Sequence, residues 1–379
     1  MRIALVHELL TMRGGAERML RAVADMFPDA PIYTLLYDEK KLGAWFPKER
    51  VRPSSLQRLA YHPLLQATSY KLQAPLFNHH LYLHRFPRAV EQWDFSDFDL
   101  VISFSSAFAH GIKTRGMTKH LCYMHTPARY LWDQTFAVLD RAEEGFLGSL
   151  KRRYLERTFH TLRQWDALAS ERPDILIAAS KAVQRRIELY FRRESEVLYP
   201  PVDTAAFPLY EGTREDYSVL VSTLVPYKRI ELAIEACNRG GKKLKIVGEG
   251  PHRRALEEMS GSTIEFLGYK NHAELVPLLQ HASTFLFPGE EDFGIAPLEA
   301  MACGTPVIAY AGGGAVETVL EGRTGAFFKR DNCDSLLQAM EISEQINYSS
   351  MACRAQAEKF AQEIFRKRMH ERVASLLPS

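Results

Sequence analysis

The stretch at 217–250, YSVLVSTLVPYKRIELAIEACNRGGKKLKIVGEG, contains the pattern that decides the fold of this chain. It begins with a short apolar run at 217–224, passes through a loop into a helical pattern at 229–239, and ends with a second apolar run at 243–250. Short apolar strands that alternate with helices are typical of parallel sheets covered on both faces. The stretch therefore predicts a strand–helix–strand unit.

The same alternation runs through the rest of the chain. Further apolar strand candidates lie at 2–9, 99–106, 120–126 and 174–180 in the first half, and at 264–268, 283–289, 306–310 and 325–328 in the second. Helical patterns lie between them at 14–27, 181–191, 252–260, 272–280 and 315–320. We therefore predict the α/β class, with two Rossmann-like, doubly wound parallel sheets.

A proline-rich segment separates the two series of strands. EVLYPPVDTAAFPL, at 196–209, contains three prolines and no helical period. Two consecutive prolines stiffen a chain into an extended form, which suits a linker. We place the boundary here, between a first domain of 1–198 and a second of 199–357. Two such domains leave a cleft lined by the carboxyl ends of both sheets, where ligands usually bind.

The composition is that of a soluble globular protein, because 46% of the 379 residues are hydrophobic and 25% are charged. The apolar runs are too short for a membrane span or for the core of a signal peptide. The five cysteines are odd in number and show no Cys-x-x-Cys spacing, so neither a disulfide framework nor a zinc site is indicated. We expect a cytoplasmic protein.

Charge is distributed unevenly along the chain. Residues 1–200 carry 29 Lys and Arg against 22 Asp and Glu, giving +7, and residues 201–379 carry 19 against 24, giving −5, which sums to +2. No Asp or Glu occurs at 50–90 or at 100–132. These runs are either solvated loops or a surface that meets an anionic membrane or a phosphorylated acceptor. The near-neutral total argues against a nucleic-acid partner.

Two glycines, Gly14 and Gly15, follow the first strand candidate at the start of a helical pattern. Glycines there let backbone N–H groups approach an anion that also feels the helix dipole, although a plain tight turn explains the pair equally well. The spacing is not Gly-x-Gly-x-x-Gly, which argues against a nicotinamide-type dinucleotide.

Two adjacent cations, Lys228 and Arg229, lie where a strand and its loop give way to a helix. Positive charge at a helix N-terminus is unfavourable to the helix dipole, so the pattern indicates an anion that offsets it. A diphosphate suits this place, with lysine as a point charge and arginine as a bidentate fork. Ordinary surface charge is the alternative interpretation.

Two glutamates frame the start of a helix in GEEDFGIAPLEAMACGTPVIAY, at 289–310. Because Pro297 is tolerated only near the first turn, the helix should begin at about 294–295. Glu291 then lies in the preceding loop with backbone N–H groups that suit sugar hydroxyls and phosphate oxygens. Glu299 points from the first turns and suits a vicinal diol such as a ribose. Local capping or pairing remains the alternative for both.

A histidine, His125, ends the apolar strand candidate at 120–126, in the segment YMHTPARYLWD at 123–133. It should lie at the carboxyl edge of the first sheet, where ligands bind. A structural histidine beside a proline turn is the competing interpretation.

Together these motifs resemble those of the retaining glycosyltransferases of the GT-B fold, specifically the large family 4, over nearly the whole chain. Glu291 and Glu299 look like the E-x7-E motif of that family, flanked by FGIAPLEAMACGTPVIA and GGGAVETVLEGRTGAFF. VPYKRIEL looks like its phosphate-binding loop, VGEGP like its base-side strand and loop, and GGAER like its N-terminal glycine loop. HTPARYLWD is similar to the active-site histidine segment of members that glycosylate lipid-linked saccharides, often from GDP-mannose.

The resemblance implies a role for each of these positions. It assigns donor-sugar hydroxyls to Glu291, the ribose to Glu299, and the diphosphate to Lys228 and Arg229. The rest of the donor-binding set that it implies is Gly14, Gly15, Gly248, Tyr269, Phe293, Gly294, Ile295 and Leu298. The implied acceptor-binding residues are His125, Arg129 and Tyr130, and the implied catalytic residues are His125, Lys228, Arg229 and Glu291. Many family members have an arginine where this chain has Thr223, so the second phosphate charge would come from Arg229 or be absent.

The activity implied by the resemblance is retaining transfer of a hexose from a nucleoside-diphosphate sugar, with GDP-mannose as the leading donor, to a polyprenyl-diphosphate-linked saccharide at the inner face of the cell membrane. We expect no cofactor and no divalent metal, because no Asp-x-Asp motif lies in a suitable loop. The C-terminal helix, at about 358–379, is implied to pack back on the first domain. The alternatives are a UDP-sugar-dependent transferase with a soluble acceptor, a non-catalytic sugar-nucleotide-binding module and a sugar-nucleotide epimerase.

Overall fold

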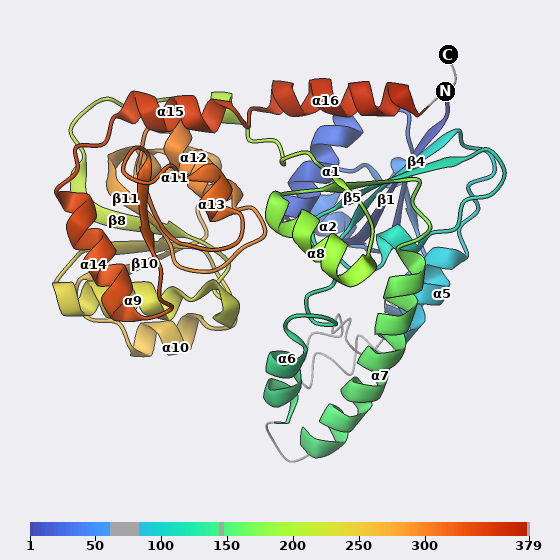
Figure 1. Ribbon diagram of the computed structural model, residues 1–379, viewed down its shortest axis with the longest axis horizontal. Coiled ribbons are helices and arrows are strands. Elements are labelled where there is room, and N and C mark those ends of the chain that lie inside the picture. The colour runs from blue at the N-terminus through green and yellow to red at the C-terminus, as the bar shows by residue number, and fades with distance from the viewer. Residues whose placement is uncertain (61–82, 144–147, 377–379) are drawn as a thin grey trace. The chain divides into compact units, whose positions relative to one another are not determined.

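The computed structural model describes residues 1–60, 83–143 and 148–376. The chain forms two compact units, one of Met1–Leu198 with Arg368–Ser379 and one of Tyr199–Lys367, each built around a parallel sheet (Figure 1).

The sheet of the first unit has seven strands in the order β3-β2-β1-β4-β5-β6-β7, and all of its paired neighbours are parallel. The strands are β1 (Ile3–Leu10), β2 (Ile32–Tyr37), β3 (Val51–Pro53), β4 (Leu100–Ser105), β5 (Lys119–Met124), β6 (Ile175–Ala178) and β7 (Glu196–Val197). The strand order reverses between β1 and β4, where Val6 pairs with Ser103. That reversal is the topological switch point, the usual position of a ligand in an open α/β sheet.

Helices cover both faces of this sheet, and every residue of β4 is buried. They are α1 (Gly15–Met26), α2 (Glu39–Leu42), α3 (Leu56–Ala60), α5 (Phe86–Glu91), α6 (Thr135–Ala142), α7 (Gly148–Ala169) and α8 (Lys181–Phe191), with the 3-10 turns η1 (Lys48–Arg50) and η3 (Ala109–Gly111). The last residues of α16 (Gln362–Ser375) also belong to this unit: Arg372 pairs with Glu196, and the rings of His370 and Phe27 are 5.7 Å apart.

The sheet of the second unit has six strands in the order β10-β9-β8-β11-β12-β13, again all parallel. The strands are β8 (Glu215–Val221), β9 (Leu244–Val247), β10 (Ile264–Gly268), β11 (Ala282–Phe287), β12 (Val307–Tyr310) and β13 (Gly325–Phe328). The helices are α9 (Ile230–Gly240), α10 (Arg253–Glu258), α11 (His272–His281), α12 (Ile295–Ala302), α13 (Ala315–Thr318), α14 (Cys333–Glu344), α15 (Ser350–Glu358) and the start of α16, with the 3-10 turns η4 (Thr204–Ala206) and η5 (Pro226–Lys228). Its strand order reverses between β8 and β11.

Both faces of the second sheet are buried as well. Val219 and Leu220 are adjacent on β8 but belong to two different core clusters. Phe285 and Leu286 on β11 divide between the same two clusters. Because successive side chains of a strand point to opposite faces, this division means that helices pack on each side. The predicted doubly wound, parallel architecture is therefore confirmed for both units.

The basic segment at 150–165 forms most of α7, a helix of 22 residues. Its buried side chains include Leu155, Phe159 and Leu162, whose spacing of three or four residues marks one helix face, while Lys151, Arg153 and Arg157 are exposed. Among the described residues, no helix is long and apolar enough to cross a bilayer. Part of the acid-free run at 50–90, namely 61–82, lies outside the described residues.

Candidate functional site

Two loops at the carboxyl edge of the second sheet bring Lys228 and Glu291 together. Lys228 ends η5 after β8, and Glu291 lies in the loop after β11, so the two residues meet at the switch point of that sheet. Lys228 Nζ lies 2.5 Å from Glu291 Oε2, and the two side chains are only 16% and 21% exposed. The pair is a half-buried ion pair, which holds both groups in a defined position.

Glycines let the backbone pack closely around this pair. A Cβ on Gly289 would lie 2.9 Å from the Lys228 carbonyl oxygen. A Cβ on Gly313 would overlap the Glu291 carbonyl oxygen, and the φ of +56° at Gly313 favours glycine. The N–H of Gly314 donates to that same oxygen at 2.8 Å. Gly313 and Gly314 were not assigned from the sequence, although three consecutive glycines were the available signal.

The helix after Glu291 begins where the sequence predicts. α12 starts at Ile295, and Gly294 is its N-cap with a φ of +88°. Phe293 and Leu298 are buried in the core of the unit. Glu299 is also buried, at 6% exposure, whereas Glu291 in the loop is half-buried. The two glutamates therefore occupy different surroundings, as expected from the position of Pro297.

The surroundings of Arg229 correct the expectation that the cations at this helix start need an external anion. Arg229 adopts the left-handed conformation, with a φ of +55°, at the N-cap of α9. Its guanidinium lies 2.9 Å from Asp331 and 3.0 Å from Glu231. Since Lys228 is paired with Glu291, carboxylates of the chain already offset both cations. The cations at this helix start therefore do not by themselves require an external anion.

The remaining donor-site predictions of the second unit, Gly248 and Tyr269, lie after neighbouring strands of its sheet. Gly248 follows β9 with a φ of +134°, and a Cβ there would overlap the Ser222 carbonyl oxygen at the end of β8. Tyr269 follows β10 and is 74% exposed, so its ring is accessible. Both residues thus lie at the carboxyl edge that also carries Lys228.

In the first unit, His125 follows β5 at the carboxyl edge of the sheet. Its N–H donates to the Ser105 carbonyl oxygen at 2.8 Å, and its ring centroid is 6.5 Å from that of His7. Burial, with a further contribution from His7, lowers the pKa of His125 to about 3. Its Nε2 is buried and has no hydrogen-bond partner among the residues described. His125 is therefore a neutral imidazole with one unused polar atom.

The glycine loop of the first unit is occupied by a side chain of the chain itself. Gly14 is the N-cap of α1 in an ordinary extended conformation, and its N–H donates to Glu17 Oε2 at 2.9 Å. Glu17 Oε1 lies 3.3 Å from His7 Nε2. Gly15 begins the helix. The Gly14 amide, which we expected to meet an anion, already donates to a carboxylate.

The two other acceptor-site predictions lie in the segment after His125. The Arg129 guanidinium pairs with Asp133 at 3.2 Å. The Tyr130 ring packs 5.5 Å from that of Phe159, and its hydroxyl is buried without a hydrogen-bond partner in the described part of the chain. Burial raises the pKa of Tyr130 well above its usual value, so this hydroxyl remains a donor.

A carboxylate that sequence reasoning missed lies at the switch point of the first sheet. Glu8, near the carboxyl end of β1, accepts a hydrogen bond from Ser105 Oγ at 3.0 Å. The same Oε1 atom accepts four successive backbone N–H groups, those of 106–109, at 2.8, 2.5, 2.6 and 3.2 Å. Such an array of amides forms an anion-binding nest. Here the anion is Glu8 itself.

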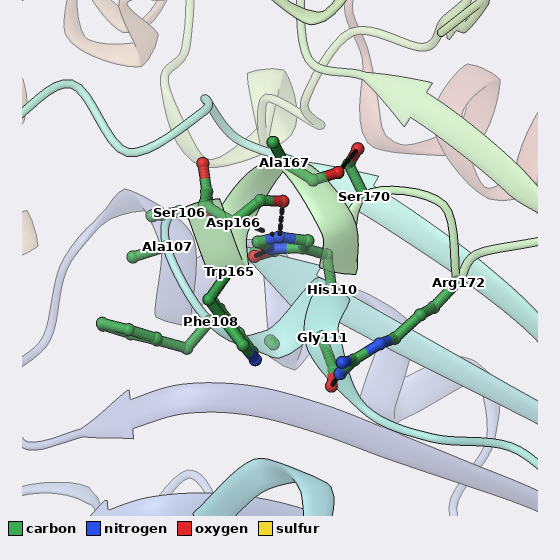
Figure 2. Close-up of polar contacts among 12 residues, drawn as sticks. Ser106, Ala107, Phe108, His110, Gly111, Trp165, Asp166, Ala167, Ser170 and Arg172 are labelled. Carbon is green, nitrogen blue, oxygen red and sulfur yellow. Dashed lines mark hydrogen bonds and ion pairs between the residues drawn. The ribbon is translucent and has the colours of Figure 1, made fainter. Parts of the chain in front are cut away.

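Next to this nest is a polar cluster that contains His110 and Asp166, whose side chains are both fully buried (Figure 2). His110 Nδ1 is 3.0 Å from Ser105 Oγ, and His110 Nε2 is 3.4 Å from Asp166 Oδ1. Asp166 Oδ2 accepts the indole N–H of Trp132 at 2.7 Å. The cluster thus connects Glu8 on β1 with α7 and with the segment that carries His125.

Comparisons with known proteins find similarity mainly in the second unit. Residues 203–360 match the family model described as Glycosyl transferases group 1. An uncharacterized glycosyltransferase of Methanocaldococcus jannaschii is 28% identical over 184 residues, 47% of this chain and 51% of that protein. A GDP-mannose-dependent alpha-(1-6)-phosphatidylinositol monomannoside mannosyltransferase of Mycolicibacterium smegmatis is 31% identical over 203 residues, 44% of this chain and 52% of that protein. The chain thus spans about half the length of these curated relatives.

Solved structures match the whole chain. HepE of Anabaena, solved in complex with UDP, matches with a TM-score of 0.69 at 17% identity, over 99% of this chain and 100% of that one. Sucrose-phosphate synthase of Thermosynechococcus elongatus matches with a TM-score of 0.68 at 16% identity, over 98% and 99%. Likeness at such identities shows the fold alone. Together with the two parallel sheets, it confirms the predicted GT-B fold.

Proposed function

We propose that the chain is a retaining glycosyltransferase of family 4, which transfers a hexose from a nucleoside-diphosphate sugar to a saccharide acceptor. The observation that carries this proposal is the Lys228–Glu291 pair at the switch point of the second sheet, 2.5 Å apart, within the range that matches Glycosyl transferases group 1. A fixed cation beside a fixed carboxylate suits a ligand that carries a diphosphate next to sugar hydroxyls.

The chemistry of the pair explains how it can serve such a donor. An ammonium group has three N–H donors, so Lys228 can keep its bond to Glu291 and still donate to oxygens of the diphosphate. Glu291 has further lone pairs for hydroxyls of the donor sugar. Because the ion pair already fixes both side chains, little reorganisation is needed when the leaving group develops charge.

In the proposed reaction, the bond between the anomeric carbon and the diphosphate oxygen breaks while a bond to the acceptor oxygen forms on the same face. The proton of the acceptor hydroxyl passes to an oxygen of the leaving diphosphate. Lys228 offsets the charge of that leaving group. We assign to His125, a neutral imidazole with an unused Nε2, a hydrogen bond to a hydroxyl of the acceptor.

GDP-mannose is our leading donor and a UDP-sugar the second candidate. The mannosyltransferase of Mycolicibacterium smegmatis is named as GDP-mannose-dependent, and HTPARYLWD is similar to segments of enzymes that often use this donor. HepE of Anabaena, in contrast, was solved with UDP and with UDP-glucose. Tyr269, exposed at the carboxyl edge of the second sheet, is the proposed neighbour of the base.

The first test is a thermal-shift panel of GDP, UDP, ADP and dTDP, each with and without EDTA. A ligand at a hundred times its dissociation constant should add about 2.7 kcal/mol to the stability of the unit that binds it. We expect GDP to stabilise the wild type independently of EDTA, and to have little effect on Lys228→Ala. Lys243→Ala is the matched control, since that side chain is 65% exposed and pairs, among the residues described, only with Asp216.

The second test measures turnover. We expect release of GDP from GDP-mannose to accelerate with a polyprenyl-diphosphate saccharide, and the product to keep the anomeric configuration of the donor. Nucleotide binding without turnover would favour the sugar-nucleotide-binding module, and conversion of the donor sugar without transfer would favour the epimerase. If no nucleotide stabilises the protein, the donor site built on Lys228 and Glu291 is wrong.

A lipid-linked acceptor also requires contact with a membrane surface, which we assign to the exposed cations of α7. Arg153 and Arg157 lie opposite its buried face, and Lys151 is exposed near its start; basic residues near an anionic bilayer each contribute about 1 kcal/mol to binding. The protein should therefore sediment with vesicles that contain phosphatidylglycerol and not with pure phosphatidylcholine. Binding that is unchanged when the three residues become alanine would remove this assignment.

A further inference from the structure

We propose that Glu8 is a hydroxyl-binding residue of the acceptor site, held in one orientation by a directed chain of hydrogen bonds that runs from Asp166 through His110 and Ser105. This inference rests on the proposed function, because it names a group of the first unit that receives the acceptor. Glu8 is the group that touches the ligand, and Asp166 is a positioning residue.

The direction of the chain follows from the donors available at Ser105. A hydroxyl has a single proton. Ser105 Oγ lies 3.0 Å from Glu8 Oε1, and a carboxylate oxygen only accepts, so the hydroxyl proton must lie between them. The contact of 3.0 Å from Ser105 Oγ to His110 Nδ1 then requires that His110 donates. The network therefore assigns the proton of the imidazole to Nδ1.

This tautomer requires one more proton at Asp166. The Nε2 atom of a neutral His110 protonated at Nδ1 is a bare acceptor, and it faces Asp166 Oδ1 and the Asp166 carbonyl oxygen, each at 3.4 Å. Three acceptors without a hydrogen would repel one another. If Asp166 is an ionised carboxylate, its buried Oδ1 atom has no hydrogen-bond donor among the described residues. A proton on Asp166 Oδ1, donated to His110 Nε2, satisfies both atoms.

The surroundings favour the neutral pair over an ion pair. Both side chains are almost completely buried, at 0% and 1% exposure, and isolating two charges from water costs more than a single bond returns. Burial raises the pKa of Asp166 to about 8 and lowers that of His110 to about 4. The other titratable or charged groups that act on the pair are Glu8, His120, Tyr130 and Arg172. Of these, the charge of Glu8 favours the acid form of Asp166, and that of Arg172 favours the neutral form of His110.

The hydrogen-bond chain ends at Glu8, whose two carboxylate oxygens differ in their hydrogen-bond partners. Oε1 receives all five donors of the cradle, whereas Oε2 has no partner in the described ranges. Glu8 is half-buried at the switch point between β1 and β4, where open α/β sheets bind ligands. Because the nest already holds a carboxylate, a phosphate would be repelled there. A neutral ligand that donates a hydroxyl, such as a sugar, fits the free oxygen.

The position of the proton is tested on the protein alone, without substrate. Two-bond ¹H–¹⁵N spectra should show His110 as the neutral Nδ1–H tautomer between pH 5 and 7. Infrared difference spectra of wild type against Asp166→Asn should show the carbonyl stretch of one protonated carboxylic acid, lost in the variant. A doubly protonated imidazole at pH 7, or the absence of that carbonyl band, would overturn the directed chain.

The role of Glu8 is tested by titration of methyl α-mannoside, a neutral probe, while the backbone amide signals of 106–109 are followed. These amides should shift on binding, and Glu8→Gln should raise the dissociation constant by about tenfold, as expected for one lost charged hydrogen bond. Mannose 6-phosphate, which is anionic, should bind more weakly than the neutral probe. Glu39→Gln is the matched control, because that side chain is 55% exposed and pairs with Lys48.

Variants of Asp166 then distinguish a role in orienting Glu8 from a general role in the stability of the fold. Asn keeps a donor toward His110 and an acceptor toward Trp132. The dissociation constant of Asp166→Asn for methyl α-mannoside should therefore stay within about threefold of wild type, whereas that of Asp166→Leu should rise about tenfold. Ser105→Ala interrupts the hydrogen-bond chain by removing a single oxygen atom, and it covers the case in which Asp166→Leu fails to fold. If the sugar shifts no amide of 106–109, or binds equally to Glu8→Gln, this inference is wrong. The nucleotide panel judges the proposed function separately.

Discussion

The two sheets present opposite charges at the same topological position. At the switch point of the second sheet, the cation Lys228 is fixed by the side chain of Glu291. At the switch point of the first sheet, the carboxylate Glu8 is fixed by four backbone N–H groups and a hydroxyl. Both arrangements immobilise a charge, one with a side-chain partner and the other with backbone dipoles.

This difference shows how one architecture separates two kinds of ligand. A cation with unused N–H donors attracts the diphosphate of a nucleotide-sugar. A carboxylate that already fills an anion nest repels phosphate and leaves an acceptor for a hydroxyl. The fold supplies the position, while the residue at the end of one strand sets the chemistry.

Removal of the cation should have the largest effect. Lys228→Ala should lower kcat by about 10²–10³, because one lost group that stabilises a leaving charge costs roughly 3 kcal/mol in the barrier. Steady-state kinetics with saturating donor measure this. Lys243→Ala should retain the wild-type kcat, and a similar loss in that control would show that general electrostatics, not the Lys228–Glu291 pair, is responsible.

Displacement of the loop that carries Glu291 should have the second-largest effect. Gly313→Ala combines a positive φ with an overlap on the Glu291 carbonyl oxygen, whereas Gly322→Ala has a φ of +72° and open space around its Cβ. The control should cost about 1 kcal/mol of strain, and Gly313→Ala about 2 kcal/mol more, with weaker binding of the nucleoside diphosphate. Thermal unfolding followed by circular dichroism compares them. Equal losses would mean that the contact with Glu291 is unimportant.

The buried pair of the first unit predicts a pH dependence of stability. A carboxyl whose pKa is higher in the folded state stabilises below its unfolded pKa, and this contribution is lost as pH rises through about 8. His110, with a lowered pKa, acts in the opposite direction only below about pH 6.5. From pH 6.5 to 8 the wild type should therefore lose roughly 2 kcal/mol relative to Asp166→Asn.

Tryptophan fluorescence can follow that change, because the four tryptophans, at 45, 93, 132 and 165, all belong to the first unit. Urea unfolding at pH 6.5 and pH 8 gives the two stabilities. Asp97→Asn, at a side chain that is 85% exposed, should show the same change in unfolding free energy between pH 6.5 and pH 8 as the wild type. A wild type whose stability does not fall between these pH values would show that Asp166 is ionised in the folded protein.

The smallest effect is expected at Arg229. Its guanidinium is engaged by Glu231 and Asp331 at a partly exposed site, and pairs of this kind contribute about 0–1 kcal/mol. Arg229→Ala should therefore change stability by less than about 1 kcal/mol and donor KM by less than about fivefold. A loss of kcat as large as that of Lys228→Ala would mean that Arg229 leaves its carboxylates to bind the diphosphate.

The features that local sequence patterns predicted correctly are those set by residues close together in the chain. The start of α12 at Ile295 follows from Pro297, and the doubly wound sheets follow from short apolar strands between helices. The loop positions of Lys228 and Glu291 were predicted as well. Their pairing across 63 positions was not, because the distance between two loops depends on strand order, which the sequence pattern leaves open.

The cluster behind Glu8 was missed for a similar reason. Glu8 meets residues about a hundred positions away, and Asp166 meets His110 at a separation of 56. On α7, Asp166 lies four residues after Leu162 and thus on the buried face of the helix, so its position in the helical period was a signal that sequence reasoning did not use. In the loop at 7–18, the glycines drew attention because their backbone freedom is a local property, whereas the partners of Glu8 come from another strand.

The division of the chain has a consequence for its synthesis. The second unit is one continuous stretch, Tyr199–Lys367, whereas the first also takes residues from Arg368 onward. On the ribosome, the first unit is therefore completed only when the residues from Arg368 onward emerge, although domains usually fold in order from the N-terminus. We expect the second unit to mature first. Removal of the C-terminal residues should accordingly damage the unit that is synthesised first.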